Sequence, residues 1–307
     1  MVSKLTPDQI RDLYTIKDRS PFYLPIKDIL GEAYQNLASP PPSMVLEDYP
    51  AFMKTIGGFR PKEFSILCGS TGVGKTTFIA GLSASMIKQN IPHYVASVET
   101  GSEDYVRRII SVFAQQDINT GEAFSKDFLY SIHKRYGSQL STSSLQLALY
   151  ENRTSVEELM SDIISAHHTH GIKLAIIDNL NFFMEVTNSA NAIIEMDRVV
   201  HELIIFCKQV NVHVIMIMHP KKNSTNSRDT RVESEFEIKG SSLAVQEAHN
   251  IFLLNRPKQE DVDSGICDKY DRELKIAKMR RMGKATGRRI IFGTSNGVSY
   301  VEKRIEE

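Results

Sequence analysis

The stretch "GSTGVGKTTF", residues 69–78, lies between a short apolar run and a segment with a helical pattern. The residues that fit the phosphate-binding pattern G-x-x-x-x-G-K-[S/T] are Gly69, Gly74, Lys75 and Thr76. Glycines let backbone amides point at phosphate oxygens, and the N-terminus of the following helix adds partial positive charge. A glycine-rich turn that only caps a helix is the alternative, but the whole pattern arises by chance in about one chain in a hundred of this length. The stretch therefore predicts a nucleotide-phosphate cradle.

Within the cradle, each kind of side chain has its own expected role. Lys75 would reach the β and γ phosphates, and the Thr76 hydroxyl would ligate magnesium. The residues expected to bind the nucleotide here are Gly69, Ser70, Thr71, Gly72, Val73, Gly74, Lys75, Thr76 and Thr77. The expected cofactors are therefore ATP, or another nucleoside triphosphate, and Mg²⁺.

Short apolar runs alternate with helical segments along most of the chain. The predicted strands are 64–67, 93–98, 173–178, 212–218 and 250–254, and the predicted helices between them are 76–89, 155–168 and 195–209. Strands rich in Val, Ile and Leu that alternate with helices predict an α/β fold with a mostly parallel sheet covered on both faces. Near the C-terminus the segments 273–278, 288–292 and 297–302 predict an antiparallel extension at one edge of that sheet.

Length and composition indicate a soluble globular protein. The chain has 307 residues, of which 41% are hydrophobic and 24% charged, enough for a sizeable core. It holds no run of about eighteen apolar residues that would predict a membrane span. Its three scattered cysteines indicate a reducing compartment. Asp8 and Asp12 argue against an organellar transit peptide, so we expect an intracellular, cytoplasmic location in a phage or bacterial system rather than a mitochondrion.

Basic and acidic residues balance at 37 each. A nucleic-acid-binding surface would therefore have to be a local basic patch.

Two acidic residues follow predicted strands in positions that suit nucleotide hydrolysis. Asp178 ends the run "KLAIID" and would complete the magnesium site with the cradle. Glu99 follows "HYVASV" and is a candidate for orienting the attacking water. The alternative for Glu99 is a solvated carboxylate at the start of the next helix.

The order of several motifs resembles that of a known family. They are "GGFRPKEFSILCGSTGVGKTTF", "SVET", "LAIIDNLNFFM", "HVIMIMHPKK", "IKGSSLAVQEAHNIFLL" and "KMRRMGKATG". This order is similar to that of the hexameric replicative DNA helicases of the DnaB superfamily, closest to the helicase domains of Twinkle and the phage primase-helicases. The resemblance covers about residues 50–302 and implies a RecA-like P-loop NTPase core.

The resemblance implies roles for residues around the γ phosphate. Glu99 would polarise the attacking water, while His219 and Gln246 would sense the γ phosphate and couple its loss to loop movement. Without its neighbours, His219 would be interpreted as a satisfied histidine at the end of a strand. Arg256 would stack on the nucleotide base.

An arginine finger is also implied. Arg280, with Lys278 two residues earlier, resembles the arginine that one subunit inserts into the nucleotide site of its neighbour. Alternation on a strand would place these two side chains on the same face. The family usually has one residue fewer between the finger and the glycine that matches Gly287, so Arg281 stays an alternative finger.

Single-stranded DNA would bind the polar segment 219–240, which by its pattern has no regular structure. Lys221, Lys222 and Lys239 best match the family's contacts to DNA phosphates in the central channel of the ring. Such contacts are independent of sequence and sensitive to salt. Charge alone would also fit an ordinary surface loop.

The N-terminal region predicts helices over Thr6–Ile16 and 26–37, followed by the stiff linker "SPPPS" at 39–43. We expect residues 1–43 to be a helical arm that packs on an adjacent subunit, and residues 44–307 to be the helicase ATPase domain.

The expected function is a ring-forming, NTP-driven DNA helicase that translocates on single-stranded DNA to unwind duplex DNA during replication. We expect self-association into a hexamer, a primase or polymerase as partner, and no association with a membrane. The rival functions are a RecA-like recombination ATPase and a KaiC-like regulatory ATPase that does not grip DNA.

Overall fold

The computed structural model describes residues 25–38, 42–118, 124–142, 144–150, 154–179, 189–221, 231–239 and 242–306. The chain divides between Pro42 and Ser43 into two units, each described by itself. The first contains helix α2 (Ile26–Ala38), which confirms the helix predicted at 26–37. The predicted helix Thr6–Ile16 lies outside the described residues, as does most of the linker at 39–43.

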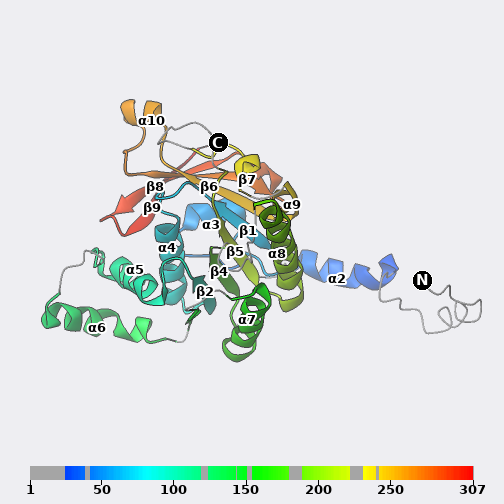
Figure 1. Cartoon of the computed structure of the whole chain (residues 1–307), viewed down its shortest axis with the longest axis horizontal. Coiled ribbons are helices and arrows are strands. Elements are labelled where there is room, and N and C mark those ends of the chain that lie inside the picture. Colours follow the sequence, from blue (N-terminus) through cyan, green and yellow to red (C-terminus); the bar gives the residue numbers. More distant parts are fainter. Residues whose placement is uncertain are drawn as a thin grey trace, which may run out of the picture. The chain divides into compact units, whose positions relative to one another are not determined.

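The described part of the second unit is built on a nine-stranded sheet of order β3-β2-β4-β5-β1-β6-β7-β8-β9 (Figure 1). Its strands are β1 (Phe64–Cys68), β2 (His93–Ser97), β3 (Leu145–Leu147), β4 (Leu174–Asp178), β5 (His213–Met218), β6 (Asn250–Asn255), β7 (Arg272–Met279), β8 (Arg289–Ser295) and β9 (Ser299–Glu306). The strands from β3 to β6 are parallel, and β7, β8 and β9 extend the sheet in antiparallel pairs. The predicted mostly parallel sheet with an antiparallel C-terminal edge is confirmed.

Helices cover both faces of the sheet. The described helices of this unit are α3 (Pro50–Ile56), α4 (Lys75–Lys88), α5 (Ser102–Ala114), α6 (Lys126–Leu140), α7 (Val156–His170), α8 (Ser189–Val210), α9 (Ser242–Glu247) and α10 (Gln259–Asp263), of which α10 has no buried residue. The start of α7 is stabilised by a capping box. The Ser155 hydroxyl oxygen accepts from the Glu158 backbone amide, and the Glu158 carboxylate accepts from the Ser155 backbone amide. Gly171 ends this helix in the left-handed conformation that glycine adopts without strain.

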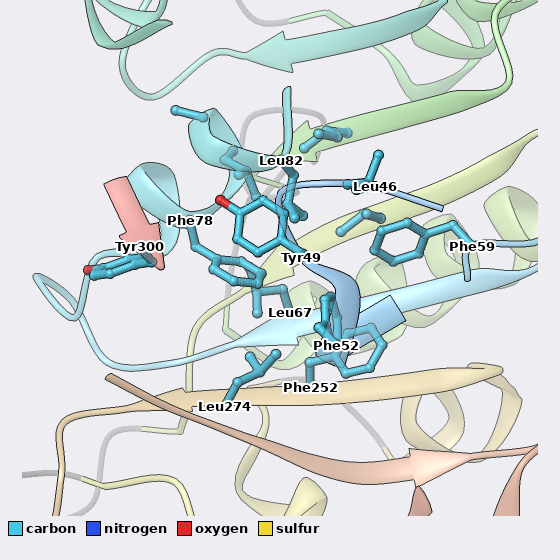
Figure 2. Packing of buried hydrophobic residues seen from close by; sticks show 14 of the residues in the cluster. Leu46, Tyr49, Phe52, Phe59, Leu67, Phe78, Leu82, Phe252, Leu274 and Tyr300 are labelled. Carbon is cyan, nitrogen blue, oxygen red and sulfur yellow. The ribbon is translucent and has the colours of Figure 1, made fainter. Parts of the chain in front are cut away.

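Alternation along the central strands divides the core into two apolar clusters. On β1, Leu67 belongs to one cluster, whereas Ile66 and Cys68 belong to the other. The first cluster includes side chains of α4 and α5, and the second includes side chains of α7 and α8, on opposite faces of the sheet (Figure 1). In the first cluster, Figure 2 shows Phe52 packed against Phe252, with ring centroids 5.5 Å apart. Both faces are therefore sealed, as a parallel sheet requires.

Parts of the sequence-based description were incomplete or wrong. No helix or strand was predicted for α3, α6, α9, α10 or β3, and α8 begins earlier than the predicted 195. The segment 219–240 is not structureless at its base, since Pro220 and Ile238 form an antiparallel bridge and residues 235–237 form a 3-10 turn. We call residues 219–221 and 231–239 the foot of this segment. Backbone pairing between distant residues, which local patterns do not reveal, organises the foot.

Candidate functional site

The cradle lies where β1 leads into α4, at the carboxyl end of the parallel strands. Gly72 and Gly74 have φ angles of +76° and +99°, which L side chains rarely adopt. A β carbon on Gly69 would lie 2.5 Å from the carbonyl oxygen of Leu254, and one on Gly74 would collide with the hydroxyl of Tyr300. The glycines of the motif are therefore required by backbone geometry and by close packing against β6 and β9.

Lys75 lies over the cradle with its side chain folded back. Its ammonium donates to the carbonyl oxygens of Gly69 at 2.8 Å and Ser70 at 3.0 Å. Burial lowers the pKa of Lys75, and the nearby Asp178 carboxylate is among the groups that oppose this shift. Because the first amides of α4 have no partners earlier in the helix, the cradle presents amide donors and a cation to the same space.

Thr76 and Asp178 meet at the start of α4 and the end of β4. The Thr76 hydroxyl donates to Oδ2 of Asp178 at 3.1 Å, and Asp178 is only 2% exposed. Burial raises the pKa of Asp178 to about 6; the negative charge of Glu99 adds to the shift, and the Thr76 hydrogen bond opposes it. Two adjacent oxygen donors suit Mg²⁺, which prefers hard oxygen ligands. These residues fit the predicted metal.

Glu99 and His219 lie next to each other, beyond the ends of β2 and β5. Asn179 connects them: its amide donates to Oε2 of Glu99 at 2.5 Å and lies 3.4 Å from Nε2 of His219. The other ring nitrogen of His219 is 3.5 Å from the Lys75 ammonium. Burial, followed by the charge of Lys75, lowers the pKa of His219. The structure thus gathers Lys75, Thr76, Glu99, Asp178 and His219 around one space at the carboxyl ends of the strands.

The three basic residues of the "KMRR" motif have different partners. The Lys278 ammonium donates to the carbonyl oxygens of Val245 at 2.6 Å and Gln246 at 2.7 Å, and the Arg280 guanidinium donates to the same Gln246 oxygen at 2.5 Å. The expected same-face arrangement of Lys278 and Arg280 is therefore present. Arg281 instead pairs with the buried carboxylate of Glu63 at 3.2 Å.

This cationic group lies at the opposite end of the sheet from the cradle. Met279 pairs with Asn250, and Asn250 pairs with Ser65 near the start of β1. The cradle follows Cys68, at the other end of β1. The structure therefore does not bring Lys278, Arg280 or Gln246 to the cradle of their own chain.

Lys221 and Lys239 lie on the two paired segments of the foot, Lys221 opposite Glu237 and Lys239 opposite His219. The amide of Lys221 donates to the carbonyl oxygen of Glu237 at 2.7 Å, and the amide of Lys239 donates to that of His219 at 2.9 Å. Phe236, in the 3-10 turn, is 66% exposed, and its carbonyl oxygen accepts from the Lys221 ammonium at 2.8 Å. Lys222 lies outside the described residues.

Arg256 follows β6 directly, near the cradle side of the sheet. Burial raises the pKa of Tyr300, and the charges of Arg272 and Arg256 oppose this shift. Arg256 follows Leu254 by two residues, and the carbonyl oxygen of Leu254 lies against Gly69 of the cradle.

Comparison with protein families matches residues 45–296 to the family described as the DnaB-like helicase C-terminal domain. This match spans most of the chain. The chain belongs to the DnaB-like helicase C-terminal domain family.

Curated relatives and solved structures agree with this family. A protein named "Probable replicative DNA helicase" from Trieres chinensis is 24% identical over 233 residues, covering 73% of this chain and 50% of the relative. "Replicative DNA helicase DnaB" from Synechocystis sp. is 23% identical over 277 residues, covering 86% of this chain and 31% of the relative. The chain thus spans half or less of the length of these two relatives.

Two solved structures share the fold of this DnaB-like domain. The ATPase domain of G40P superposes with a TM-score of 0.74 at 16% identity, covering 91% of this chain and 99% of the other. A DnaB-like replicative helicase, described together with its interactions with primase, gives a TM-score of 0.70 at 15% identity, covering 97% of this chain and 71% of the other. The RecA-like fold expected from the sequence is confirmed.

Three residues of the DnaB-like domain join the site without having been predicted. Asn179 immediately follows Asp178 in the sequence, and its position after a strand-ending aspartate was the available signal. Arg272 donates to the carbonyl oxygen of Val73 at 2.6 Å, and the Tyr300 hydroxyl lies 3.5 Å from the same oxygen. Both come from the C-terminal edge strands, which no local motif links to the cradle.

Among the described residues, no helix combines the length and the apolar character needed to cross a bilayer.

Proposed function

We propose that this chain is an NTP-driven DNA helicase that assembles into a ring, translocates on single-stranded DNA and unwinds duplex DNA in replication. The observation that supports the proposal is that the cradle and the Lys278–Arg280 pair, which we propose to be two parts of one nucleotide site, lie at opposite ends of the sheet. The cradle lies at the carboxyl ends of the parallel strands, and the Lys278–Arg280 pair lies at their amino ends. A second copy of the chain is needed to bring the two together.

Hydrolysis would begin with the triphosphate held by the cradle amides and the Lys75 ammonium. Thr76 and Asp178 would hold Mg²⁺, which supplies charge neutralisation at the β and γ phosphates when bound. Glu99 would orient the attacking water, with its carboxylate fixed by the Asn179 amide. His219 lies 3.5 Å from the Lys75 ammonium and 3.4 Å from the Asn179 amide, and we expect it to respond to loss of the γ phosphate.

Arg280 is the better candidate for the finger. Its guanidinium donates to the neutral carbonyl oxygen of Gln246, and a charged phosphate would compete strongly for the guanidinium. Arg281 is already paired with the buried Glu63 carboxylate, so its removal from that partner would leave a buried charge. Gln246 lies next to Lys278 and Arg280, because its carbonyl oxygen accepts from both side chains. If Gln246 senses a γ phosphate, that phosphate would therefore belong to the nucleotide of the neighbouring subunit.

The foot would provide contacts to DNA phosphates through Lys221 and Lys239, and the same role for Lys222 stays a prediction. The foot begins at His219, so the proposed DNA contacts and the proposed phosphate sensor share one short stretch of backbone. Stacking of a nucleotide base by Arg256 is supported by its proximity to Tyr300 and the cradle.

Assembly into a hexameric ring would use the N-terminal region. On α2, apolar side chains are exposed at spacings that fall on one helical face: Ile26, Ile29, Leu30, Tyr34 and Leu37. An exposed apolar face of this kind suits packing on an adjacent copy. The expected division into an arm at 1–43 and an ATPase domain at 44–307 is proposed on the same grounds. A primase or polymerase partner is proposed because one matching structure is described together with its interactions with primase.

The deciding experiment is strand separation on a forked DNA duplex with ATP and Mg²⁺, beside a Lys75→Ala control. Unwinding that disappears in the control would support the proposal. Hydrolysis that ignores added single-stranded DNA, with no unwinding, would favour the regulatory ATPase. Hydrolysis stimulated by DNA, again without unwinding, would favour the recombination ATPase.

A further inference from the structure

The C-terminal part of the foot is attached to the sheet by the partly buried side chain of Arg231. This side chain is 14% exposed, and its guanidinium reaches three acceptors. It lies 2.8 Å from a carboxylate oxygen of Glu273 and 2.8 Å from one of Glu233, and it also donates to the carbonyl oxygen of Arg256. A planar guanidinium engaged on several sides fixes both the position and the orientation of its backbone.

Asn255 fastens the next residue of the foot. Its side-chain oxygen accepts from the amide of Val232 at 2.8 Å, and its side-chain amide donates to the carbonyl oxygen of Val232 at 2.9 Å. Asn255 pairs with Glu273 in the register of β6 and β7, so the two attachments lie on neighbouring strands. Lys275, two residues further along β7, donates to the carbonyl oxygen of Glu233 at 2.7 Å.

The ion pair between Arg231 and Glu273 is costly for a purely structural attachment. The Glu273 side chain is fully buried, with Arg289 as a second cation at 3.5 Å. Desolvation of buried charges offsets most of their attraction, and well-packed apolar side chains often hold a segment at least as firmly. A buried ion pair instead imposes a defined geometry. We therefore take the Arg231–Glu273 pair to specify the position of the foot.

The strands that hold the foot also contact the cradle. Arg272 precedes Glu273 on β7 and donates to the carbonyl oxygen of Val73 at 2.6 Å. On β6, the carbonyl oxygen of Leu254 lies so close to Gly69 that a β carbon there would be 2.5 Å away. A short chain of direct contacts therefore runs from Arg231 through β7 to the phosphate-binding loop.

We propose that the Arg231–Glu273 ion pair couples single-strand binding at the foot to the nucleotide state of the cradle. The proposal rests on the helicase function proposed above. A shift of Val73 on phosphate binding moves Arg272 and, through the adjacent Glu273, changes the position of the foot. Arg231 is a positioning residue, since it acts through Glu273 and not on the reacting atoms.

The test is to measure how strongly nucleotide changes DNA affinity. The dissociation constant of a fluorescein-labelled oligothymidylate is determined with and without a non-hydrolysable ATP analogue and Mg²⁺, and the ratio of the two is the coupling factor. Coupling between linked sites is typically about 5- to 150-fold. In Arg231→Gln and Glu273→Gln we expect the factor to fall below about threefold, with affinity for the analogue alone within about threefold of the wild type.

Arg198→Gln is the matched control, because Arg198 likewise has three acceptors, all of them carboxylates, but lies on α8. It should keep the full coupling factor. Arg231→Lys keeps the charge without the guanidinium geometry, and we expect an intermediate factor. If a glutamine variant does not fold, the test uses Arg231→Lys instead. A coupling factor in Arg231→Lys equal to that of the wild type overturns the proposal.

Other outcomes are equally decisive. A coupling factor equal to that of the wild type in both folded glutamine variants overturns the proposal. A loss of affinity for the analogue as large as the loss of coupling also overturns it, because the ion pair would then be only structural. A wild type that binds DNA identically with and without the analogue also overturns it. A wild type that does not bind single-stranded DNA at all contradicts the proposed helicase function instead.

Discussion

The Asp178 carboxyl is expected to lower the stability of the nucleotide-free protein. It is 2% exposed at the end of β4, and its pKa is raised from 3.8 to about 6, mainly by burial. Because one pKa unit corresponds to about 1.36 kcal/mol, this difference costs the ionised native state about 3 kcal/mol. Asp178→Asn removes the charge and keeps a side-chain oxygen that can accept from the Thr76 hydroxyl.

The sign of the pH dependence follows from the direction of the shift. The native carboxyl binds its proton more tightly than the unfolded one, so stability falls as pH rises from 3.8 through about 6. Without metal or nucleotide, Asp178→Asn should therefore raise the free energy of unfolding by up to about 3 kcal/mol near pH 8. The gain should shrink below pH 6 and nearly vanish near pH 4, while Mg²⁺-dependent hydrolysis is lost.

Urea unfolding of the metal-free wild type and variant, measured near pH 8, pH 6 and pH 4, tests this reasoning. Asp104→Asn is the control, because the Asp104 side chain is 59% exposed and its removal should change stability by less than about 0.5 kcal/mol. An Asp178→Asn variant that is no more stable than the wild type near pH 8 would refute the argument. A gain that is equal at all three pH values would refute it too.

Three further predictions concern the finger, two buried histidines and the cradle. Arg280→Ala subunits titrated into the wild type should depress ATP hydrolysis more steeply than dilution; a linear loss would sink the assignment of a finger acting across an interface. His93 and His213 are fully buried with pKa values lowered from 6.5 to about 4, mainly by burial. Burial of each neutral histidine should therefore lower the free energy of unfolding by about 3 kcal/mol as pH falls from 6.5 through 4. Urea unfolding at pH 7 and pH 4.5 measures this loss, and equal stability at the two pH values would contradict it. Gly74→Ala should abolish nucleotide binding in an equilibrium titration, because the new methyl group meets a tyrosine hydroxyl as well as backbone strain. In Gly72→Ala the added methyl group meets no other atom, so backbone strain alone should lower the free energy of unfolding by about 1–3 kcal/mol. Equal nucleotide affinity in the two variants would contradict the packing argument.

Local sequence patterns were sufficient for the cradle and the central strands. The phosphate-binding pattern specifies both a backbone conformation and its chemistry, and the strands beside β1 are buried on both faces, so each appears as a continuous apolar run. The location of Asp178 near the cradle could be predicted because parallel strands end at the same edge of a sheet, whereas the choice of Glu99 depended mainly on the resemblance.

What the sequence did not reveal depends on contacts between distant residues. The three residues of β3 form a strand only because 145–147 pair with 93–95, and so short a run has no pattern of its own. Tyr300 reaches the cradle because β9 packs against α4, far away in the sequence. The foot was predicted to be structureless because its order comes from Asn255 and Glu273 on other strands. The catalytic roles assigned from the resemblance stay predictions.

The strand β7 relates two nucleotide sites in the proposed ring. At one end, Arg272 holds the carbonyl oxygen of Val73 in the chain's own cradle. Beyond the other end, Arg280 would enter the cradle of a neighbour. Eight residues of strand span about 25 Å; β7 pairs with β6 along this length, with one register shift opposite Ile251 and Phe252, and with β8 over residues 272–275. We expect a displacement of Val73 by bound phosphate to be transmitted along this strand toward Arg280. The same strand carries Glu273, so one element contacts both the cradle and the foot. In the proposed ring it would also reach the neighbouring subunit.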